Sequence, residues 1–173
     1  MSFHHISRKL LLFGLLVGGG CSGVPMLPQL PQGPPVQNPA GSPQPEAMAR
    51  DVFERINRRR ESVGLRPLVW DATLAYLAAE HSNEMAAGRR PFGHDGFEAR
   101  MAAARSAIPV ARGSENVGRN TYPAGQSVAA AVTGWIESPG HRQNLEGNFQ
   151  LTGVGVARAP NGEYFLTQLF VGS

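Results

Sequence analysis

Two side chains that can do chemistry, an imidazole and a carboxylate, each stand between glycines in the middle of the chain. His94 lies in residues 91–97 (PFGHDGF), and Glu115 lies in residues 113–118 (GSENVG). Glycine-rich stretches favour turns, so both side chains could be presented to solvent. An imidazole can bind a metal ion or move a proton near neutral pH, and a carboxylate can orient that imidazole or accept a proton itself.

A second imidazole and carboxylate follow an apolar stretch later in the chain. Glu137 ends that stretch, and His141 comes four residues later in residues 138–145 (SPGHRQNL). Taken singly, each of the four side chains is more typical of an ordinary polar group near a turn than of a functional one. Their meaning therefore depends on the elements that position them.

The motifs of several common enzyme classes are absent from the sequence. Residues 80–84 read EHSNE and not the HExxH of zinc peptidases, and there is no GxSxG or phosphate-binding loop. The glycines of residues 153–155 lie in a predicted strand and are not followed by a helix, as a dinucleotide-binding motif requires. Cys21 is the only cysteine, so no intramolecular disulfide can form.

The basic residues do not gather into a nucleic-acid-binding surface. The chain has 16 lysines and arginines against 13 acids, and loss of residues 1–20, with Arg8 and Lys9, would leave 14 against 13. The run of three arginines at residues 58–60 would fan around a predicted helix, so we interpret it as a solvated face. No nucleic-acid partner is predicted.

The first 21 residues have the features of an export signal, with a basic start, a short apolar run and small residues before a cysteine. The apolar run, residues 10–17, is far shorter than the roughly 20 residues that span a bilayer. The stretch resembles the lipobox of bacterial lipoproteins, although leucine usually stands at the position of Gly18. We expect the protein to be anchored to a membrane in the cell envelope by acylation of Cys21, with simple secretion as the alternative.

The rest of the chain divides into a tether and one domain. Residues 22–45 are rich in proline, glycine and glutamine, which predicts a disordered, proline-stiffened tether. Residues 46–173 carry most of the aromatic and β-branched residues and form the predicted domain. The sequence gives no prediction of its oligomeric state.

Hydrophobic periodicity predicts helices first and an antiparallel ribbon last within the domain, which indicates an α+β fold. The expected elements are a helix before Gly64, an extended segment at residues 65–70, a helix between Asp71 and Gly88, a helix at 97–104, a brief strand at 108–110, a helix at 127–136 that ends at Pro139 and Gly140, and two strands around Asn161-Gly162. The Asn-Gly pair predicts a type I′ hairpin turn. His81 falls on the apolar face of the second helix, where a satisfied core histidine is expected.

Several short stretches together match a known family. They are residues 56–58 (INR), 64–68 (GLRPL), 92–94 (FGH), 114–117 (SENV), 135–145 (WIESPGHRQNL), 153–157 (GVGVA) and 167–168 (TQ). From residue 46 onward the chain resembles the CAP superfamily, named for cysteine-rich secretory proteins, antigen 5 and pathogenesis-related 1 proteins, and especially its bacterial members. The chain lacks the disulfides of eukaryotic members, and Arg142 and Gln143 replace the usual residues after His141. These departures put the ligand specificities of animal and plant members in doubt.

The resemblance implies an α-β-α sandwich with a small antiparallel sheet and an open cleft lined by His94, Glu115, Glu137 and His141. The two histidines would be ligands of a divalent metal, with zinc the first choice because imidazole suits it. The carboxylates would orient waters or the imidazoles, and would raise the pKa of the histidines.

The resemblance also implies a binding module more than a conventional enzyme. Its ligand would be a lipid or other small hydrophobic molecule, a peptide or a cell-wall fragment. The alternative is a metal-assisted hydrolase in which Glu115 or Glu137 is the candidate base. A structural or surface-interaction role is the third possibility.

Overall fold

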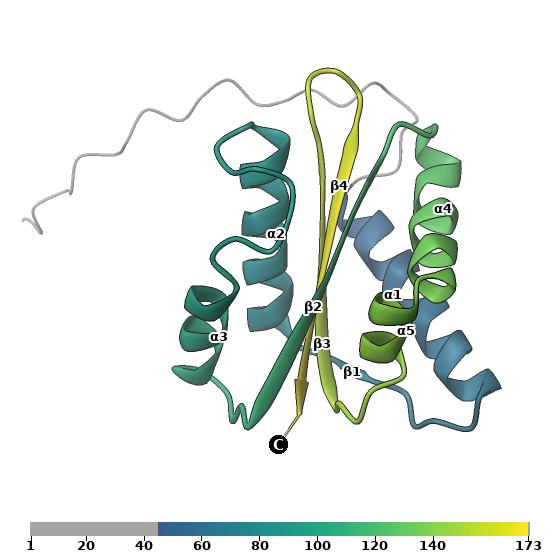
Figure 1. The fold of residues 1–173 in the computed structure, drawn as a ribbon, viewed down its shortest axis with the longest axis vertical. Helices are drawn as coiled ribbons and strands as arrows, with labels where there is room; N and C mark the ends of the chain where they lie inside the picture. Colours follow the sequence, from purple (N-terminus) through teal and green to yellow (C-terminus); the bar gives the residue numbers. More distant parts are fainter. Residues whose placement is uncertain (1–44, 173) are drawn as a thin grey trace, which may run out of the picture. The chain divides into compact units, whose positions relative to one another are not determined.

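Five helices and four strands follow one another along residues 45–172, the part of the chain that the computed structural model describes (Figure 1). Their order is α1 (Pro45–Ser62), β1 (Val69–Trp70), α2 (Ala72–Ala86), α3 (Phe97–Arg105), β2 (Arg112–Asn120), α4 (Ala124–Glu137), α5 (Pro139–Leu145), β3 (Leu151–Arg158) and β4 (Tyr164–Gly172). The predicted export signal, with Cys21, and the predicted tether lie outside the described residues. None of the helices between residues 45 and 172 is both long and apolar enough to cross a membrane.

The four strands form one mixed sheet in the order β1-β3-β4-β2. Strand β4 pairs antiparallel with both β3 and β2, whereas β1 runs parallel to β3. Helices α2 and α3 cover one face of this sheet, and α1, α4 and α5 cover the other (Figure 1). The α-β-α sandwich is confirmed, and β1 makes the sheet mixed where an antiparallel one was expected.

The core consists of three apolar clusters packed against the sheet. On the face of α1 and α4, Val52, Ile56 and Trp135 pack with Phe170. A second cluster joins side chains of α2 and α3 to β4, namely Leu74, Ala78, Met101, Ala104, Leu169 and Val171. A third, smaller cluster consists of Met85, Val117, Ala159 and Phe165. The three-layer arrangement buries both faces of the sheet. Because Cys21 is the only cysteine, no intramolecular disulfide adds to the stability that this packing provides.

Helix α2 lies unusually close to β3, and two glycines permit this. A Cβ atom on Gly153 would lie 2.0 Å from the backbone nitrogen of Ala75, and one on Gly155 would lie 2.1 Å from that of Ala79. Any side chain at either position would therefore push α2 away from the sheet. The GVGV stretch is a packing surface for a helix.

One predicted strand is wrong, one predicted helix end is confirmed, and one short helix was not predicted. Residues 108–110 are not a strand, because Ile108 and Val110 are partly buried against the cluster beneath α2 and α3, and the strand begins at Arg112. Pro139 does not simply end the preceding helix: it occupies the first turn of α5, where its missing N–H costs nothing.

The β3–β4 hairpin is confirmed, but its turn is not type I′. Gly162 has a φ of +91°, whereas Asn161 has a negative φ, since glycines alone have positive φ among residues 45–172. The Gly162 N–H donates to Ala159 O at 2.9 Å, which places Pro160 and Asn161 at the two central positions. Proline fixes φ near −65°, so the turn cannot adopt the mirror-image conformation.

The three consecutive arginines do not form one solvated face. Arg60 is 3% exposed and donates to the carbonyl oxygens of Arg66, Leu145 and Gly147. Arg59 is half-buried and binds Glu146 at 2.7 Å, while Arg58, the first arginine of the run, is exposed. The guanidinium of Arg60 thus ties the end of α1 to the end of α5.

Side chains occupy the outer edges of the sheet. Asn57 on α1 donates to Leu68 O at 3.0 Å and accepts from Leu68 N at 2.8 Å, next to β1. At the opposite edge, Glu115 O accepts from Asn144 at 3.2 Å. Each amide makes a hydrogen bond that a further strand would otherwise make.

Candidate functional site

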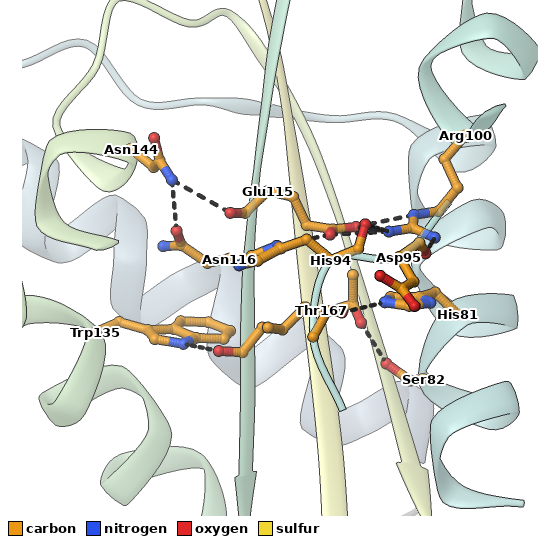
Figure 2. Close-up of polar contacts among 12 residues, drawn as sticks. His81, Ser82, His94, Asp95, Arg100, Glu115, Asn116, Trp135, Asn144 and Thr167 are labelled. Carbon is orange, nitrogen blue, oxygen red and sulfur yellow. Dashed lines mark hydrogen bonds and ion pairs between the residues drawn. The ribbon is translucent and has the colours of Figure 1, made fainter. Parts of the chain in front are cut away.

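Glu115 and Asn116 are neighbours in the middle of β2 and point to opposite faces of the sheet. Glu115 lies opposite Leu169 of β4, and Asn116 lies opposite Gln168. Glu115 is 6% exposed and Asn116 is fully buried, so both side chains require polar partners. Glu115 finds them in the layer of α2 and α3, and Asn116 finds them in α5. The site is therefore divided between the two helical layers (Figure 2).

His94 lies against Glu115 on the first side. Its Nδ1 is 2.9 Å from Glu115 Oε1, and its side chain is 54% exposed whereas that of Glu115 is 2% exposed. Arg100 on α3 donates from Nε to Glu115 Oε2 and from Nη2 to Oε1, each at 2.9 Å (Figure 2). A carboxylate held in this bidentate way is an acceptor, so neutral His94 carries its proton on Nδ1 and exposes a bare Nε2.

His81 supports the loop that carries His94. It is 1% exposed, and its Nε2 donates to Gly93 O at 2.8 Å. Burial lowers the pKa of His81, and this effect outweighs the opposing effect of the hydrogen bond to Gly93. The expected core position is confirmed, but Nδ1 has no protein partner among the described residues, so the ring is only half satisfied.

His141 lies on the second side, in α5. Its Nδ1 is 2.9 Å from Ser138 Oγ, and no carboxylate of residues 45–172 bonds to the ring. Burial lowers the pKa of His141, and the positive charge of His94 lowers it further. The expected rise in pKa is wrong for His141, because the ring is partly buried and has a hydroxyl neighbour instead of an acid.

A network of amides fixes α5 against β2. Asn116 Nδ2 donates to the backbone carbonyl of His141 at 3.1 Å, and Asn144 Nδ2 donates to Asn116 Oδ1 at 2.8 Å and to Glu115 O at 3.2 Å. Trp135 Nε1 donates to Val117 O at 3.0 Å (Figure 2). These bonds hold the backbone of His141 in place.

Glu137 lies apart from the other three predicted residues. It is exposed at the end of α4 and lines a hollow of about 560 Å³ over that helix. His141 lines a different hollow of about 280 Å³ between β2 and α4, together with Val117, Trp135 and Ser138. Within residues 45–172, no hydrogen bond or ion pair joins Glu137 to either histidine. Ser138, the next residue, is the one whose side chain contacts His141.

Metal binding, if it occurs, would use few protein ligands. Across the described part of the chain, no group of three or more histidine, cysteine, aspartate and glutamate side chains is placed to hold a metal ion. The two open Nε2 atoms, of His94 and His141, fit imidazole ligation. Other coordination positions would be left for water or for a bound molecule.

Sequence reasoning missed the residues that position the histidines. Arg100 gave no signal, since it falls within an ordinary predicted helix. Ser138 and Asn144 stand in the SPGHRQNL stretch, but a hydroxyl and an amide have no distinctive spacing there. Asn116 stands beside Glu115, and the alternation of side chains along a strand would have predicted its opposite orientation, had β2 been expected.

The solved structures with the same fold include bacterial surface, extracellular and secretory proteins. An outer surface protein of Borrelia burgdorferi has a TM-score of 0.65 and 17% identity, over 76% of this chain and 96% of that one. An extracellular protein with an SCP domain from Bacillus anthracis has a TM-score of 0.61 and 28% identity, over 78% of this chain. A cysteine-rich secretory protein from Staphylococcus aureus has a TM-score of 0.62 and 20% identity, over 79% of this chain.

This chain spans only 45% of the Bacillus protein and 42% of the Staphylococcus protein. No curated protein matches it in sequence. A family model described as CAP, the cysteine-rich secretory protein family, matches residues 53–170. That match covers most of the chain and nearly all of the described domain, so the protein belongs to the cysteine-rich secretory protein family.

Proposed function

We propose that this protein is an exported binding module whose site holds a divalent metal ion, zinc by preference, through Nε2 of His94 and Nε2 of His141. One observation carries the proposal: each imidazole is backed at Nδ1, by Glu115 in one case and by Ser138 in the other. A backed Nδ1 fixes the ring and leaves Nε2 for a ligand, which is how metal-binding histidines are usually oriented.

Two protein ligands would make a weak, open metal site. Structural zinc sites have four protein ligands and catalytic ones commonly three, so two imidazoles would leave positions for water and for a donor atom of a second molecule. When bound, zinc would supply a Lewis-acid centre at this point. The lowered pKa of His141 favours this role, because a neutral imidazole is the form that binds metal.

The second molecule would enter the hollow beside His141. Its wall combines the apolar Trp135 and Ala131 with the polar Ser138 and His141. At about 280 Å³ it is smaller than most drug-sized pockets, which measure roughly 300–1,000 Å³. We propose that it accepts part of a small hydrophobic, peptide or cell-wall ligand.

The geometry favours binding over hydrolysis. Both carboxylate oxygens of Glu115 are held by Arg100, and one is also hydrogen-bonded to His94. Neither oxygen of this carboxylate is therefore free of hydrogen bonds to the protein. Glu137 lines another hollow, so neither candidate base is placed to activate a water beside both histidines.

Export of the protein, with anchoring through acylated Cys21, belongs to the same proposal. It is supported by the signal-like residues 1–21 and by the surface and extracellular relatives. Mass spectrometry of the protein purified from its own membranes should find a diacylglyceryl group on Cys21. A mature protein that begins after Cys21 would contradict anchoring and favour secretion.

The metal site is tested by calorimetric titration of zinc into the tag-free, full-length chain. The wild-type protein should bind one zinc ion, and His94→Ala and His141→Ala should each abolish that binding. Glu137→Gln is the matched control and should bind as the wild type does. Equal binding by the wild type and both alanine variants would refute the site.

A further inference from the structure

Arg100 lies buried behind His94 and donates to the backbone oxygen of that residue at 3.5 Å, but it does not bond to the imidazole. It is 8% exposed, although a guanidinium is rarely withdrawn from water without several acceptors. Beyond its two bonds to Glu115, its Nη1 donates to Asp95 O at 2.9 Å (Figure 2). One guanidinium therefore grips a carboxylate of β2 and the backbone next to His94.

These contacts leave His94 little freedom on the side away from solvent. The ring is bonded to Glu115, whose carboxylate cannot turn without breaking two bonds to Arg100. The backbone of the loop is bonded on one side of His94 through Asp95 O, and on the other side through Gly93 O and the imidazole of His81. A ring that is 54% exposed would otherwise sample several rotamers and both neutral tautomers.

We propose that Arg100 is a positioning residue that sets the tautomer and direction of the His94 imidazole, and thereby the affinity of the site for its metal. The effect of Arg100 on metal affinity rests on the proposed function, whereas its effect on the tautomer and direction of the imidazole does not. Arg100 acts only through Glu115 and the loop backbone. Loss of a group that orients a metal ligand typically weakens metal binding by about 10- to 100-fold.

The first arm of the test needs no metal. Long-range ¹H–¹⁵N NMR of the imidazoles at pH 7.5 should show wild-type His94 as a single tautomer with its proton on Nδ1. Arg100→Met should show a mixture of tautomers at His94 while the His141 signals stay unchanged. Arg105→Met, on the exposed face of the same helix, is the matched control and should match the wild type.

The second arm is the zinc titration of the same proteins. Arg100→Met should bind zinc at least about ten-fold more weakly than wild type and Arg105→Met. Arg100→Lys keeps a positive charge beside Glu115, which protects folding, but cannot hold both carboxylate oxygens and the loop; it should resemble Arg100→Met.

The two arms separate failure of this inference from failure of the proposed function. An unchanged His94 tautomer in both Arg100 variants would overturn the positioning role, whatever the zinc result. A shifted tautomer in a protein whose wild type binds no zinc would uphold the positioning role and refute the metal site. Wild-type tautomer and zinc affinity in Arg100→Lys would show that charge alone suffices, which also overturns the inference.

Discussion

The two histidines of the site differ in what stands behind them. His94 is backed by Glu115, which is in turn held by Arg100, so its half is a chain of charges from the layer of α2 and α3. His141 is backed by the neutral hydroxyl of Ser138, and its backbone is held by the amide of Asn116. In the first half an exposed imidazole lies on a buried ion pair, whereas in the second a partly buried imidazole is supported by neutral groups.

The comparison shows that a carboxylate in one half and a hydroxyl in the other can each hold an imidazole by its Nδ1. Each leaves Nε2 of an imidazole open, but the ionic half depends on a buried pair whose members need each other. The neutral half depends on several hydrogen bonds of about equal strength. Removing one group from the ionic half should therefore lower the free energy of unfolding more than removing one group from the neutral half.

The largest effect is expected for Glu115→Ala. This change leaves the guanidinium of Arg100 buried without its anion, which should lower the free energy of unfolding by about 3–5 kcal/mol. Urea denaturation followed by tryptophan fluorescence measures it. Ser138→Ala, the corresponding change behind His141, should cost only about 1 kcal/mol. Equal losses in the two variants would show that the halves are not supported differently.

An intermediate effect is expected for Asn116→Ala. The side chain is fully buried, and its loss leaves the carbonyl of His141 and the amide of Asn144 without this partner. The cost should be about 2 kcal/mol. Hydrogen exchange should quicken in α5 and stay unchanged in α3. Asn83→Ala, an exposed amide on α2, serves as the control, and faster exchange in both helices would argue against a local role.

The smallest effect is expected from pH. Burial lowers the pKa of both His81 and His141 in the folded state. The unfolded chain takes up these protons first, near the ordinary histidine pKa of about 6.5. Stability is thus fully present above that pH and falls as the pH drops from there toward the lowered folded pKa values.

Thermal unfolding measured between pH 7.5 and 5 checks this prediction. His81→Gln and His141→Gln should each lose part of the fall in stability, although acidic groups contribute to the remainder. A melting temperature with the same pH dependence in both variants and the wild type would contradict the assignment to these histidines.

The helices and the family were predictable because their signals are local. The spacing around Val52 and Ile56, the cap at Asp71 and the glycine after α2 follow from short-range rules. Strand β2 was missed because its residues 112–120 (RGSENVGRN) have little β-propensity, and pairing with β4 holds them in place. Long-range pairing of this kind has no local signature.

The site was predictable as residue types and not as contacts. His94 and Glu115 were expected together and are bonded, since the motif positions of the family identified both. The burial of Arg100 and the pairing of His141 with Ser138 depend on where α3 and α5 lie against the sheet. One residue of register at the end of α4 decides whether Glu137 or Ser138 faces His141, and periodicity does not fix a helix end that closely.

The side chains that bond to the two edge strands of the sheet have a consequence for association between copies of the protein. A β-sheet with open sides can recruit an extended segment from another molecule and begin to polymerise. Here Asn57 occupies the backbone of Leu68 on one side, while Asn144 and Trp135 occupy carbonyls on the other. An extended segment of another molecule would have to displace these side chains before pairing with the backbone of Leu68, Glu115 or Val117, so they oppose the addition of a fifth strand at these positions.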